Sequence, residues 1–303
     1  MSDTSLVTPV VTPVFDLNTV PEHDRESVAA LIPDPRVAHG YVHRDPLPGV
    51  YDFDMFDVAV VERENVMLVG PTGSSKTTAF RSYAAERQMP LAIVECNGNM
   101  DPKTVIGRRD IDPNTNRPCW LDAPALKVIR YGGVVLFDEV NLAHPRVTAA
   151  FHGITSVLRR LDLPENGEVV RAGHGGLGEE QPVLIACALN PLGYSGTTRM
   201  NQAFRNRFPI PVKWPYLRSV EEQLVDSVAL LDFADVIRSL SEVQAPTSTN
   251  MLIEFERHVR IFGIEAAIEL FCNHYDDDEV GPVKRALDAI SDNVHDEVWA
   301  AAR

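Results

Sequence analysis

Short apolar runs alternate with helical patterns from about residue 51 to residue 215. Five of the runs are almost entirely apolar, as expected for strands that are buried on both faces of a parallel sheet. These are Val66–Val69, Leu91–Glu95, Val134–Phe137, Val183–Leu189 and Ile210–Val212. Because helical patterns lie between the runs, the sequence predicts an α/β domain with a five-stranded parallel sheet flanked by helices.

Two further elements are expected between the third and fourth of these strands. The pattern predicts a helix near Val147–Leu158, followed by a β-hairpin near Leu163–Arg171. Pro164-Glu165-Asn166-Gly167 has the composition of a tight turn, and the next four residues read as the returning strand.

The pattern changes after Pro215, where amphipathic helices follow one another with almost no strand signal. The acidic run Asp276–Glu279, followed by Gly281-Pro282, is typical of a solvated loop between two helices. Residues 216–303 are therefore expected to form a small all-α lid domain. Its predicted helices are Ser219–Leu231, Asp235–Val243, Thr249–Ile261, Ile264–Tyr275 and Val283–Val298.

The first 50 residues differ from both of these regions. They hold seven of the 22 prolines, and Val7–Val14 repeats its own tetrapeptide, which favours extended backbone over helix. Residues 1–50 are therefore expected to be a proline-rich arm, which either docks onto a neighbouring subunit or is a poorly ordered terminus. The predicted domains are then 1–50, 51–215 and 216–303.

Composition places the chain among globular proteins. It has 303 residues, 45% hydrophobic and 23% charged, and no run approaches the ~18 uninterrupted apolar residues of a membrane helix. The start, Met-Ser-Asp-Thr, has neither a basic nor an apolar region, so no secretory signal is visible. We expect a cytoplasmic protein that does not contact a membrane.

Charge and cysteine content bear on whether the protein binds nucleic acid or a metal ion. A formal net charge of −15 repels phosphodiester backbones, which makes nucleic acid an unlikely partner, although a local basic channel in an assembly stays open. The four cysteines are widely spread and fit reduced, buried thiols, and the nine histidines lack paired metal-site spacing. Neither residue type is assigned to a metal.

The segment after the first predicted strand carries the residues of a phosphate-binding loop. Loop N–H groups and a helix N-terminus would surround the phosphates, Lys76 would span the β- and γ-phosphates, and the Thr77 hydroxyl would reach Mg²⁺. The pattern Gly-x-x-x-x-Gly-Lys-[Ser/Thr] is met except at its second glycine, where Ser75 is strained if a positive φ is needed. The expected nucleotide-binding residues are Gly70, Pro71, Thr72, Gly73, Ser74, Ser75, Lys76, Thr77, Thr78 and Asp138.

An acidic pair follows the third predicted strand, at the sheet edge where ligands bind in open α/β folds. Asp138 can share the Mg²⁺ ion with Thr77, and Glu139 can polarise the water that attacks the γ-phosphate. An acidic pair at a helix N-cap is the alternative, but the phosphate loop upstream favours the catalytic interpretation.

Asn190 and two arginines complete the candidate site. Asn190 follows Val183–Leu189 and could hold the attacking water or sense the γ-phosphate. Arg205 and Arg207 precede the last strand, and at this spacing they cannot share a helix face. An arginine suits a γ-phosphate that is presented across a subunit boundary, because its charge is permanent and its planar fork matches two oxygens.

Together these residues resemble the AAA+ ATPases, and specifically the MoxR-like branch, which is similar to the dynein-related and McrB-type modules. The resemblance runs from about Val66 to Phe208. It is carried by the segments Val105–Arg109, Trp120–Leu126, Phe137–Ala143, Ala188–Pro191 and Ala203–Phe208. It implies a P-loop NTPase fold with a helical lid, with ATP and Mg²⁺ as cofactors. It also implies that Asn190 is sensor 1 and that Arg207 is the arginine finger, with Arg205 as a reserve candidate.

The resemblance also carries expectations about assembly and partners. It implies a homo-oligomeric ring, a hexamer in our expectation, in which Arg207 completes the neighbour's site. The insert Gly107–Trp120 and the hairpin near Leu163–Arg171 would face a central pore and engage a protein client, which can carry a von Willebrand factor A domain. One departure is Asn250, which stands where relatives often have the sensor 2 arginine.

Three alternatives stay open at this stage. Ser75 and Asn250 are compatible with a nucleotide-controlled assembly scaffold of weak turnover. A nucleic-acid motor would share the same ATPase residues, although its basic stripe is not evident. GTP could replace ATP, because the phosphate loop does not read the base.

Overall fold

The computed structural model describes residues 11–111, 116–191, 200–240, 242–245 and 247–301. The chain divides into an α/β unit, residues 1–70 and 76–214, and a helical unit, residues 71–75 and 215–303. Among the described residues, no helix combines the length and the apolar character that crossing a membrane requires.

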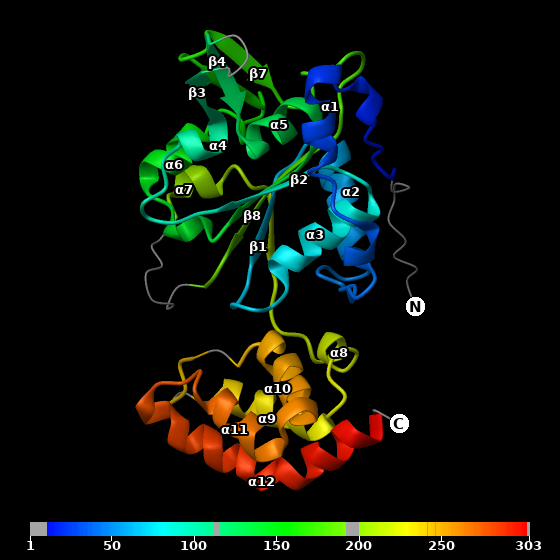
Figure 1. The fold of residues 1–303 in the computed structure, drawn as a ribbon, viewed down its shortest axis with the longest axis vertical. Coiled ribbons are helices and arrows are strands. Elements are labelled where there is room, and N and C mark those ends of the chain that lie inside the picture. Colours follow the sequence, from blue (N-terminus) through cyan, green and yellow to red (C-terminus); the bar gives the residue numbers. More distant parts are fainter. Residues whose placement is uncertain (1–10, 112–115, 192–199, 241, 246, 302–303) are drawn as a thin grey trace. The chain divides into compact units, whose positions relative to one another are not determined.

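The α/β unit is built on a five-stranded parallel sheet with the order β2-β5-β8-β1-β9 (Figure 1). Its strands are β1 (Val66–Val69), β2 (Leu91–Glu95), β5 (Gly133–Asp138), β8 (Val183–Leu189) and β9 (Ile210–Lys213). All five predicted strands are confirmed, with ends that shift by one residue at β5 and β9. The predicted fold class, a P-loop NTPase-type parallel sheet followed by a helical region, is therefore confirmed.

The alternation of side chains along each strand divides the core into two layers. Met67, Phe137 and Cys187 pack on the face covered by α5 (Pro124–Tyr131) and α6 (Pro145–Ala150). Leu68 and Leu136 pack on the other face, against α2 (Asp52–Val61) and α3 (Lys76–Glu86). Because both faces are covered, the strands are apolar at nearly every position, which explains why they were recognisable in the sequence.

The predicted helix Val147–Leu158 is wrong in its extent, because α6 ends at Ala150. The chain turns back at Gly153, which lies so close to the Arg160 carbonyl that a Cβ at this position would come within 2.3 Å of it. The turn leads directly into β6 (Arg160–Leu163). A tertiary contact therefore ends a helix that the local pattern extends.

Two antiparallel hairpins stand apart from the main sheet (Figure 1). The hairpin predicted near Leu163–Arg171 is confirmed, as β6 pairs with β7 (Glu168–Arg171). The insert Gly107–Trp120 contains a second hairpin, in which β3 (Gly107–Ile111) pairs with β4 (Pro118–Asp122). Residues 112–115 of this insert lie outside the described residues. The short helix α4 (Lys103–Ile106) precedes β3.

The described part of the N-terminal arm packs on its own α/β unit. It comprises η1 (Leu17–Thr19), α1 (Glu22–Ala29) and η2 (Pro35–Ala38). Val20 and Val28 are fully buried in a small core with Tyr131, and the Leu91 N–H donates to the Leu31 carbonyl at 2.9 Å. Much of the Val7–Val14 repeat lies outside the described residues.

The helical unit contains α8 (Arg218–Glu221), α9 (Val228–Ser239), α10 (Thr249–Phe262), α11 (Ile264–Cys272) and α12 (Asp277–Ala301). The predicted helices Ser219–Leu231 and Asp235–Val243 are wrong in their division. The chain breaks instead at Ser227, a buried N-cap whose hydroxyl accepts from the Leu230 N–H at 3.1 Å. The start of α10 at Thr249 and that of α11 at Ile264 are confirmed.

The acidic run is not a loop, which corrects a second expectation. Helix α12 begins at Asp277 and continues through Pro282. Glu279 is 6% exposed, and its carboxylate accepts from the backbone N–H groups of Gln244 and Ala245. The two donors, Gln244 and Ala245, lie 35 and 34 residues away from Glu279 in sequence, so a local charge pattern could not reveal them.

Candidate functional site

The loop between β1 and α3 has a backbone that favours glycine at two positions. Gly73 has φ +69° and Ser75 has φ +67°. The Gly70 N–H is tied to the Leu189 carbonyl of β8 at 3.1 Å, and the Ser74 hydroxyl donates to the Pro71 carbonyl at 2.8 Å. The strain expected at Ser75 is therefore present, since an L-residue in this region costs about 1–2 kcal/mol.

Lys76 opens α3 and is buried at the base of this loop. Its ammonium group donates to the Gly70 carbonyl at 2.8 Å and to Asn190 Oδ1 at 3.0 Å. Burial lowers the pKa of Lys76 to about 8, although Asp138 and Glu139 oppose this shift. A cation held among neutral oxygens beside two acidic residues is suited to receive a strongly anionic ligand.

Thr77 and Asp138 meet at the same edge of the sheet. The Thr77 hydroxyl donates to Asp138 Oδ2 at 2.5 Å, and Asp138 is the last residue of β5. Mg²⁺ prefers hard oxygen ligands and is usually held by one or two side chains together with substrate phosphates. This hydroxyl and carboxylate therefore fit the magnesium site that the sequence predicts. Lys76 lies nearby, where it could bind the phosphates.

Glu139 lies next to Asp138 with its side chain exposed. It is in the left-handed region with φ +51° and caps the short helix η3 (Val140–Leu142). Its backbone N–H donates to Asp138 Oδ1 at 3.0 Å. The strained backbone separates the two acidic side chains, so that Asp138 faces Thr77 while Glu139 stays open to water.

Asn190 is placed where the sequence predicts, directly after β8. Its side chain is 8% exposed and contacts the Lys76 ammonium. Its backbone carbonyl accepts from Asn141 Nδ2 at 3.4 Å. The contact with Lys76 brings this asparagine to the same end of the sheet as Thr77 and Asp138.

Arg205 and Arg207 lie at the opposite edge of the sheet. Arg205 ends the short helix α7 (Gln202–Arg205), and Arg207 precedes β9 by three residues. Val66 at the start of β1 pairs with Ile210 at the start of β9, whereas the phosphate loop follows the other end of β1. The length of a strand therefore separates both arginines from the phosphate loop of their own chain.

The remaining predicted loop residues differ in their exposure to solvent. Thr72 and Thr78 are exposed, Pro71, Gly73 and Ser75 are partly exposed, and Ser74 is buried. In the helical unit, Ser248 caps α10 by accepting from the Met251 N–H at 3.3 Å. Asn250 is the second residue of this helix and is exposed.

The sequence did not identify Arg44 as part of this region. Arg44 is 4% exposed, and its guanidinium lies over the Trp214 ring at 4.9 Å. The backbone N–H of Trp214 donates to the Val69 carbonyl at 2.7 Å, which places the pair at the end of β1 where the phosphate loop begins. The positive charge of Arg44 helps to lower the pKa of Lys76. No local motif marks Arg44, because the Trp214 ring that its guanidinium contacts is far away in the sequence.

Other candidate chemistry is limited. Among the described residues, no group of three or more His, Cys, Asp or Glu side chains could hold a metal ion. Cys96, Cys187 and Cys272 are buried, and Cys119 is partly buried. Burial raises the pKa of Cys96 to about 12. Cys96, Cys187 and Cys272 are core residues, as the sequence predicts, whereas Cys119 belongs to no core cluster of the described residues.

Comparison with known families agrees with this geometry. Residues 65–208 match the AAA domain (dynein-related subfamily). The α/β unit has the P-loop NTPase fold of an AAA domain. The matched segment begins just before the phosphate loop and ends just after Arg207, so all the predicted site residues of the AAA domain lie within it. An AAA domain implies nucleotide binding, generally with Mg²⁺.

Sequence similarity to other proteins extends beyond the residues that match the AAA domain. An uncharacterized protein of Staphylococcus haemolyticus is 28% identical over 245 residues, which cover 77% of this chain and 86% of that protein. An uncharacterized protein of Staphylococcus saprophyticus is 27% identical over the same shares. A solved structure from Cytophaga hutchinsonii, described as a "putative ATPase", aligns with a TM-score of 0.47 and 14% identity over 86% of each chain.

Proposed function

We propose that this protein is a Mg²⁺-dependent AAA+ ATPase of the MoxR-like type, which acts in the cytoplasm. The observation that carries this proposal is the cluster at the carboxyl edge of the sheet. Lys76 contacts Asn190, and Thr77 contacts Asp138, although the four residues come from three separate segments of the chain. Such convergence of a buried cation, a hydroxyl and a carboxylate on a glycine-containing loop supports triphosphate binding.

The chain's own residues then have distinct tasks in ATP hydrolysis. Loop N–H groups and Lys76 bind the phosphate oxygens, and Lys76 exchanges its carbonyl and amide partners for the more strongly charged ligand. Thr77 and Asp138 would hold Mg²⁺, which would supply positive charge against the bound phosphates. Glu139 accepts a proton from the attacking water, and Asn190 orients that water.

Arg207 supports an active site that is shared between subunits. It cannot reach its own phosphate loop, but it borders an open cavity of about 780 Å³. The same cavity is lined by Val157 and Leu158, which are 102% and 77% exposed. Two apolar side chains in water beside an arginine suit a surface that a second copy covers. We propose a ring, with six subunits, in which Arg207 contacts the neighbour's γ-phosphate.

The two hairpins are the proposed client-binding elements. Exposed apolar side chains lie on them, namely Ile111 at 60%, Leu121 at 44% and Val169 at 49%. Basic residues stand beside these positions, at Arg108 and Arg109. A surface of this composition supports contact with a protein, and the MoxR-like resemblance suggests a client with a von Willebrand factor A domain that the ring remodels.

Exchange of Glu139 for glutamine tests the hydrolytic function. Glu139→Gln should bind ATP with unchanged affinity, because the side chain is exposed and holds no loop residue, while turnover falls by about 10²–10⁴-fold. Calorimetry with ATP and Mg²⁺ measures binding, and phosphate release measures turnover. Full turnover in this variant would remove Glu139 from the mechanism, and an absence of ATP binding by the wild-type protein would refute the proposal.

A second candidate function is a nucleotide-controlled assembly scaffold with weak turnover. The positive φ of Ser75 favours it, because a strained loop closes less readily around phosphates. ATP-dependent oligomerisation of the wild-type chain without phosphate release would support the scaffold. Turnover that rises with protein concentration supports the ATPase.

A further inference from the structure

Asn65, directly before β1, joins three segments that are distant in sequence. It is 4% exposed, and its Nδ2 group donates to the Thr155 carbonyl at 2.9 Å and to the Arg207 carbonyl at 2.7 Å. Its backbone carbonyl accepts from the Ile210 N–H at 3.3 Å. Both Nδ2 hydrogens are therefore used, and the short segment from Arg207 to Ile210 is held at both ends by one residue.

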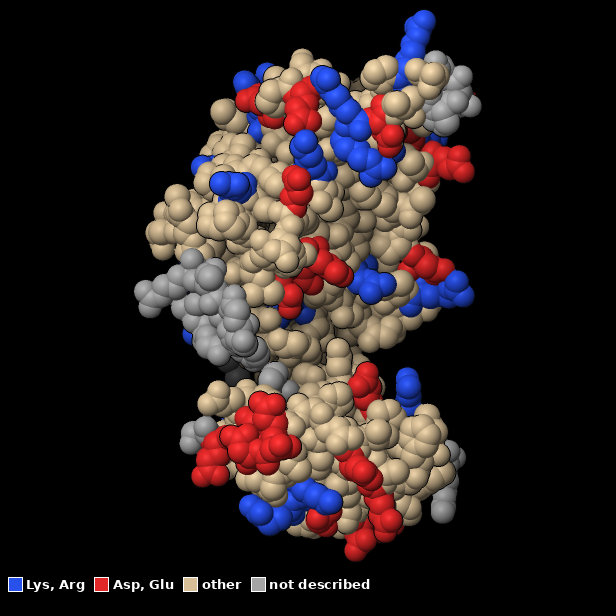
Figure 2. Space-filling model, turned by 60° about the vertical axis from the view of Figure 1, so that its left-hand side comes forward, with Lys and Arg blue, Asp and Glu red and all other residues tan. Residues whose placement is uncertain are grey.

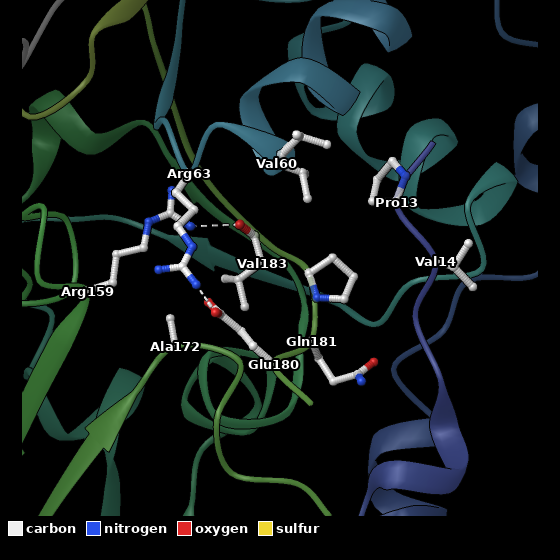
Figure 3. A pocket seen from close by; sticks show the side chains of 11 residues that line it. Pro13, Val14, Val60, Arg63, Arg159, Ala172, Glu180, Gln181 and Val183 are labelled. Atoms are coloured by element: carbon white, nitrogen blue, oxygen red, sulfur yellow. Dashed lines mark hydrogen bonds and ion pairs between the residues drawn. The ribbon is translucent and has the colours of Figure 1, made fainter. Parts of the chain in front are cut away.

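Arg159 fixes the orientation of this amide. The Arg159 Nη2 donates to Asn65 Oδ1 at 3.0 Å. Its Nη1 donates to the Val183 carbonyl at 2.8 Å (Figure 3). Because arginine has no acceptor, Asn65 must present its oxygen to Arg159 and its nitrogen to the two carbonyls. The amide cannot flip without leaving buried donors facing each other.

Arg159 is an unusual choice for a purely structural role. It is 8% exposed, and among the described residues no carboxylate forms an ion pair with it. Burial lowers the pKa of Arg159 to about 10, and the neighbouring Arg63 adds to the shift. Burying a guanidinium without a counter-charge costs free energy of folding. Here the guanidinium donates only to two neutral oxygens among the described residues, the Val183 carbonyl and Asn65 Oδ1.

The segment that contains Val157 and Leu158 is tied to the same amide. Thr155 precedes this exposed turn, Arg159 follows it, and both are bonded to Asn65. The apolar turn and the Arg207 backbone are thus connected through one side chain, and both border the same cavity. A subunit that contacts the turn would meet an arginine whose backbone is already fixed.

We propose that Asn65, oriented by Arg159, is a positioning residue that holds Arg207 for the active site of a neighbouring subunit. This inference rests on the proposed function, because it requires that Arg207 acts across a subunit boundary. Asn65 itself touches no nucleotide. It acts by fixing the Arg207 carbonyl, and hence the starting point of the arginine side chain.

Asn65→Asp isolates this role. Aspartate has the same shape and still accepts from Arg159, but it has no hydrogens for the Thr155 and Arg207 carbonyls. We expect kcat to fall by about 10–100-fold, since a displacement of about 1 Å is enough for such a loss. The KM and the affinity for ATP should stay within about twofold, because Asn65 lies at the opposite end of β1 from the phosphate loop.

Mixed assemblies distinguish a positioning role from general damage. Lys76→Ala keeps Arg207 but loses its own phosphate site, whereas Arg207→Ala keeps the site and loses the arginine. Mixing these two inactive variants should restore turnover at interfaces that combine the intact halves. Asn65→Asp should behave like Arg207→Ala, so that Lys76→Ala restores its turnover and Arg207→Ala does not.

The mixing experiment separates failure of the shared site from failure of the role proposed for Asn65. Failure of Lys76→Ala and Arg207→Ala to restore each other would refute the shared site, and with it this inference. If they do restore each other, wild-type kcat in Asn65→Asp, or its rescue by Arg207→Ala, overturns the inference alone. Asn273→Asp, the same change at an exposed helix end, is the matched control and should keep the wild-type kcat.

A second variant covers the case in which Asn65→Asp does not assemble. Arg159→Lys keeps the buried charge but cannot contact Val183 and Asn65 together, because it lacks the planar fork. It should show the same loss of kcat and the same selective rescue by Lys76→Ala. Unchanged kcat in an Arg159→Lys assembly of wild-type size would overturn the inference.

Discussion

At the scale of single residues, backbone strain marks the candidate site. Ser75 and Glu139 are non-glycine residues with φ +67° and +51°, and each adjoins a residue that would bind phosphate or magnesium. Strain of this kind persists where surrounding contacts hold the backbone in place. Here it separates Glu139 from Asp138 and shapes the turn that leads into Lys76.

Replacing Ser75 by glycine should relieve part of this strain. We expect Ser75→Gly to raise the free energy of unfolding by about 1 kcal/mol, because glycine adopts positive φ without the steric cost. ATP affinity should be equal or tighter, since the loop backbone is kept. Urea unfolding and calorimetry measure the two quantities.

Gln88→Gly is a suitable comparison for this prediction. Gln88 also has a positive φ, +51°, but lies after α3 and outside the phosphate loop. It should change stability without changing ATP affinity. A lower unfolding free energy in Ser75→Gly would mean that the serine hydroxyl contributes more than the strain costs.

At the scale of elements, the N-terminal arm is attached through a half-buried carboxylate, that of Asp24. Asp24 on α1 accepts from the Tyr131 hydroxyl at 2.6 Å and from Lys127 Nζ at 3.0 Å. Burial alone would raise the pKa of Asp24, but these hydrogen bonds and the Lys127 charge outweigh it, so the pKa is lowered. The ionised carboxylate therefore stabilises the docked arm.

This attachment should depend on pH. A lowered pKa in the folded state gives stabilisation that is complete above the ordinary pKa and disappears as the pH falls through the folded value. Asp24→Asn should cost about 1 kcal/mol at pH 7. The difference between wild type and variant in urea unfolding should narrow below about pH 4. A difference that widens with acidification would contradict the assignment, and Glu22→Gln, an exposed neighbour, should show no such trend.

The start of helix α12 depends on a tertiary contact, because its own sequence is unfavourable for a helix. Acidic residues are crowded at the start of α12, and Pro282 interrupts its hydrogen bonds. The Glu279 carboxylate is nevertheless buried, where it accepts from two backbone N–H groups. Glu279→Ala should destabilise the helical unit by about 2 kcal/mol, because the Gln244 and Ala245 donors lose their partner.

Thermal or urea unfolding of Glu279→Ala measures this cost. Asp278→Ala changes a neighbouring carboxylate that is exposed, and it should shift stability by no more than about 0.5 kcal/mol. Equal effects of the two substitutions would show that the start of α12 is held by charge pattern and not by the Glu279 contacts.

At the scale of the whole molecule, charge is distributed unevenly. Residues 215–303 carry 18 Asp and Glu against 7 Lys and Arg, and acidic side chains are conspicuous on the helical unit in Figure 2. Most of the excess negative charge therefore belongs to this unit. Because the helical unit would repel a phosphodiester backbone most strongly, the charge distribution favours protein over nucleic-acid partners.

Assembly should depend on the exposed apolar turn beside Arg207. Val157→Asp places a charge where a second copy is proposed to pack, so ATP-dependent oligomers should be lost while the unfolding free energy stays within about 0.5 kcal/mol. Sedimentation velocity in a Glu139→Gln background, which retains ATP, gives the oligomer size.

Val228→Asp offers a matched change, because Val228 is also exposed, at 54%, but lies on the helical unit. Oligomers of this variant should match the wild type in size. Intact oligomers of Val157→Asp would remove this turn from the proposed interface.

Much of the α/β unit follows from local patterns. Strands covered on both faces are apolar at consecutive positions, so β1, β2 and β8 could be located to the residue. Lys76 and Thr77 could be chosen from the phosphate-loop pattern. Asp138 and Asn190 could be chosen because parallel strands bring their carboxyl ends to one edge. Chain order and strand direction were sufficient for both inferences.

The remaining features depend on contacts between segments that are far apart along the chain. Glu279 finds its donors 34 and 35 residues away, and Asn65 meets Arg207 across 142 residues. Such hydrogen bonds leave no periodic signal, because their partners are fixed by the packing of the sheet and helices. Residue order alone thus located the candidate phosphate loop, whereas folding determined which polar groups are buried and which residues bond to the Arg207 backbone, because those contacts join distant segments.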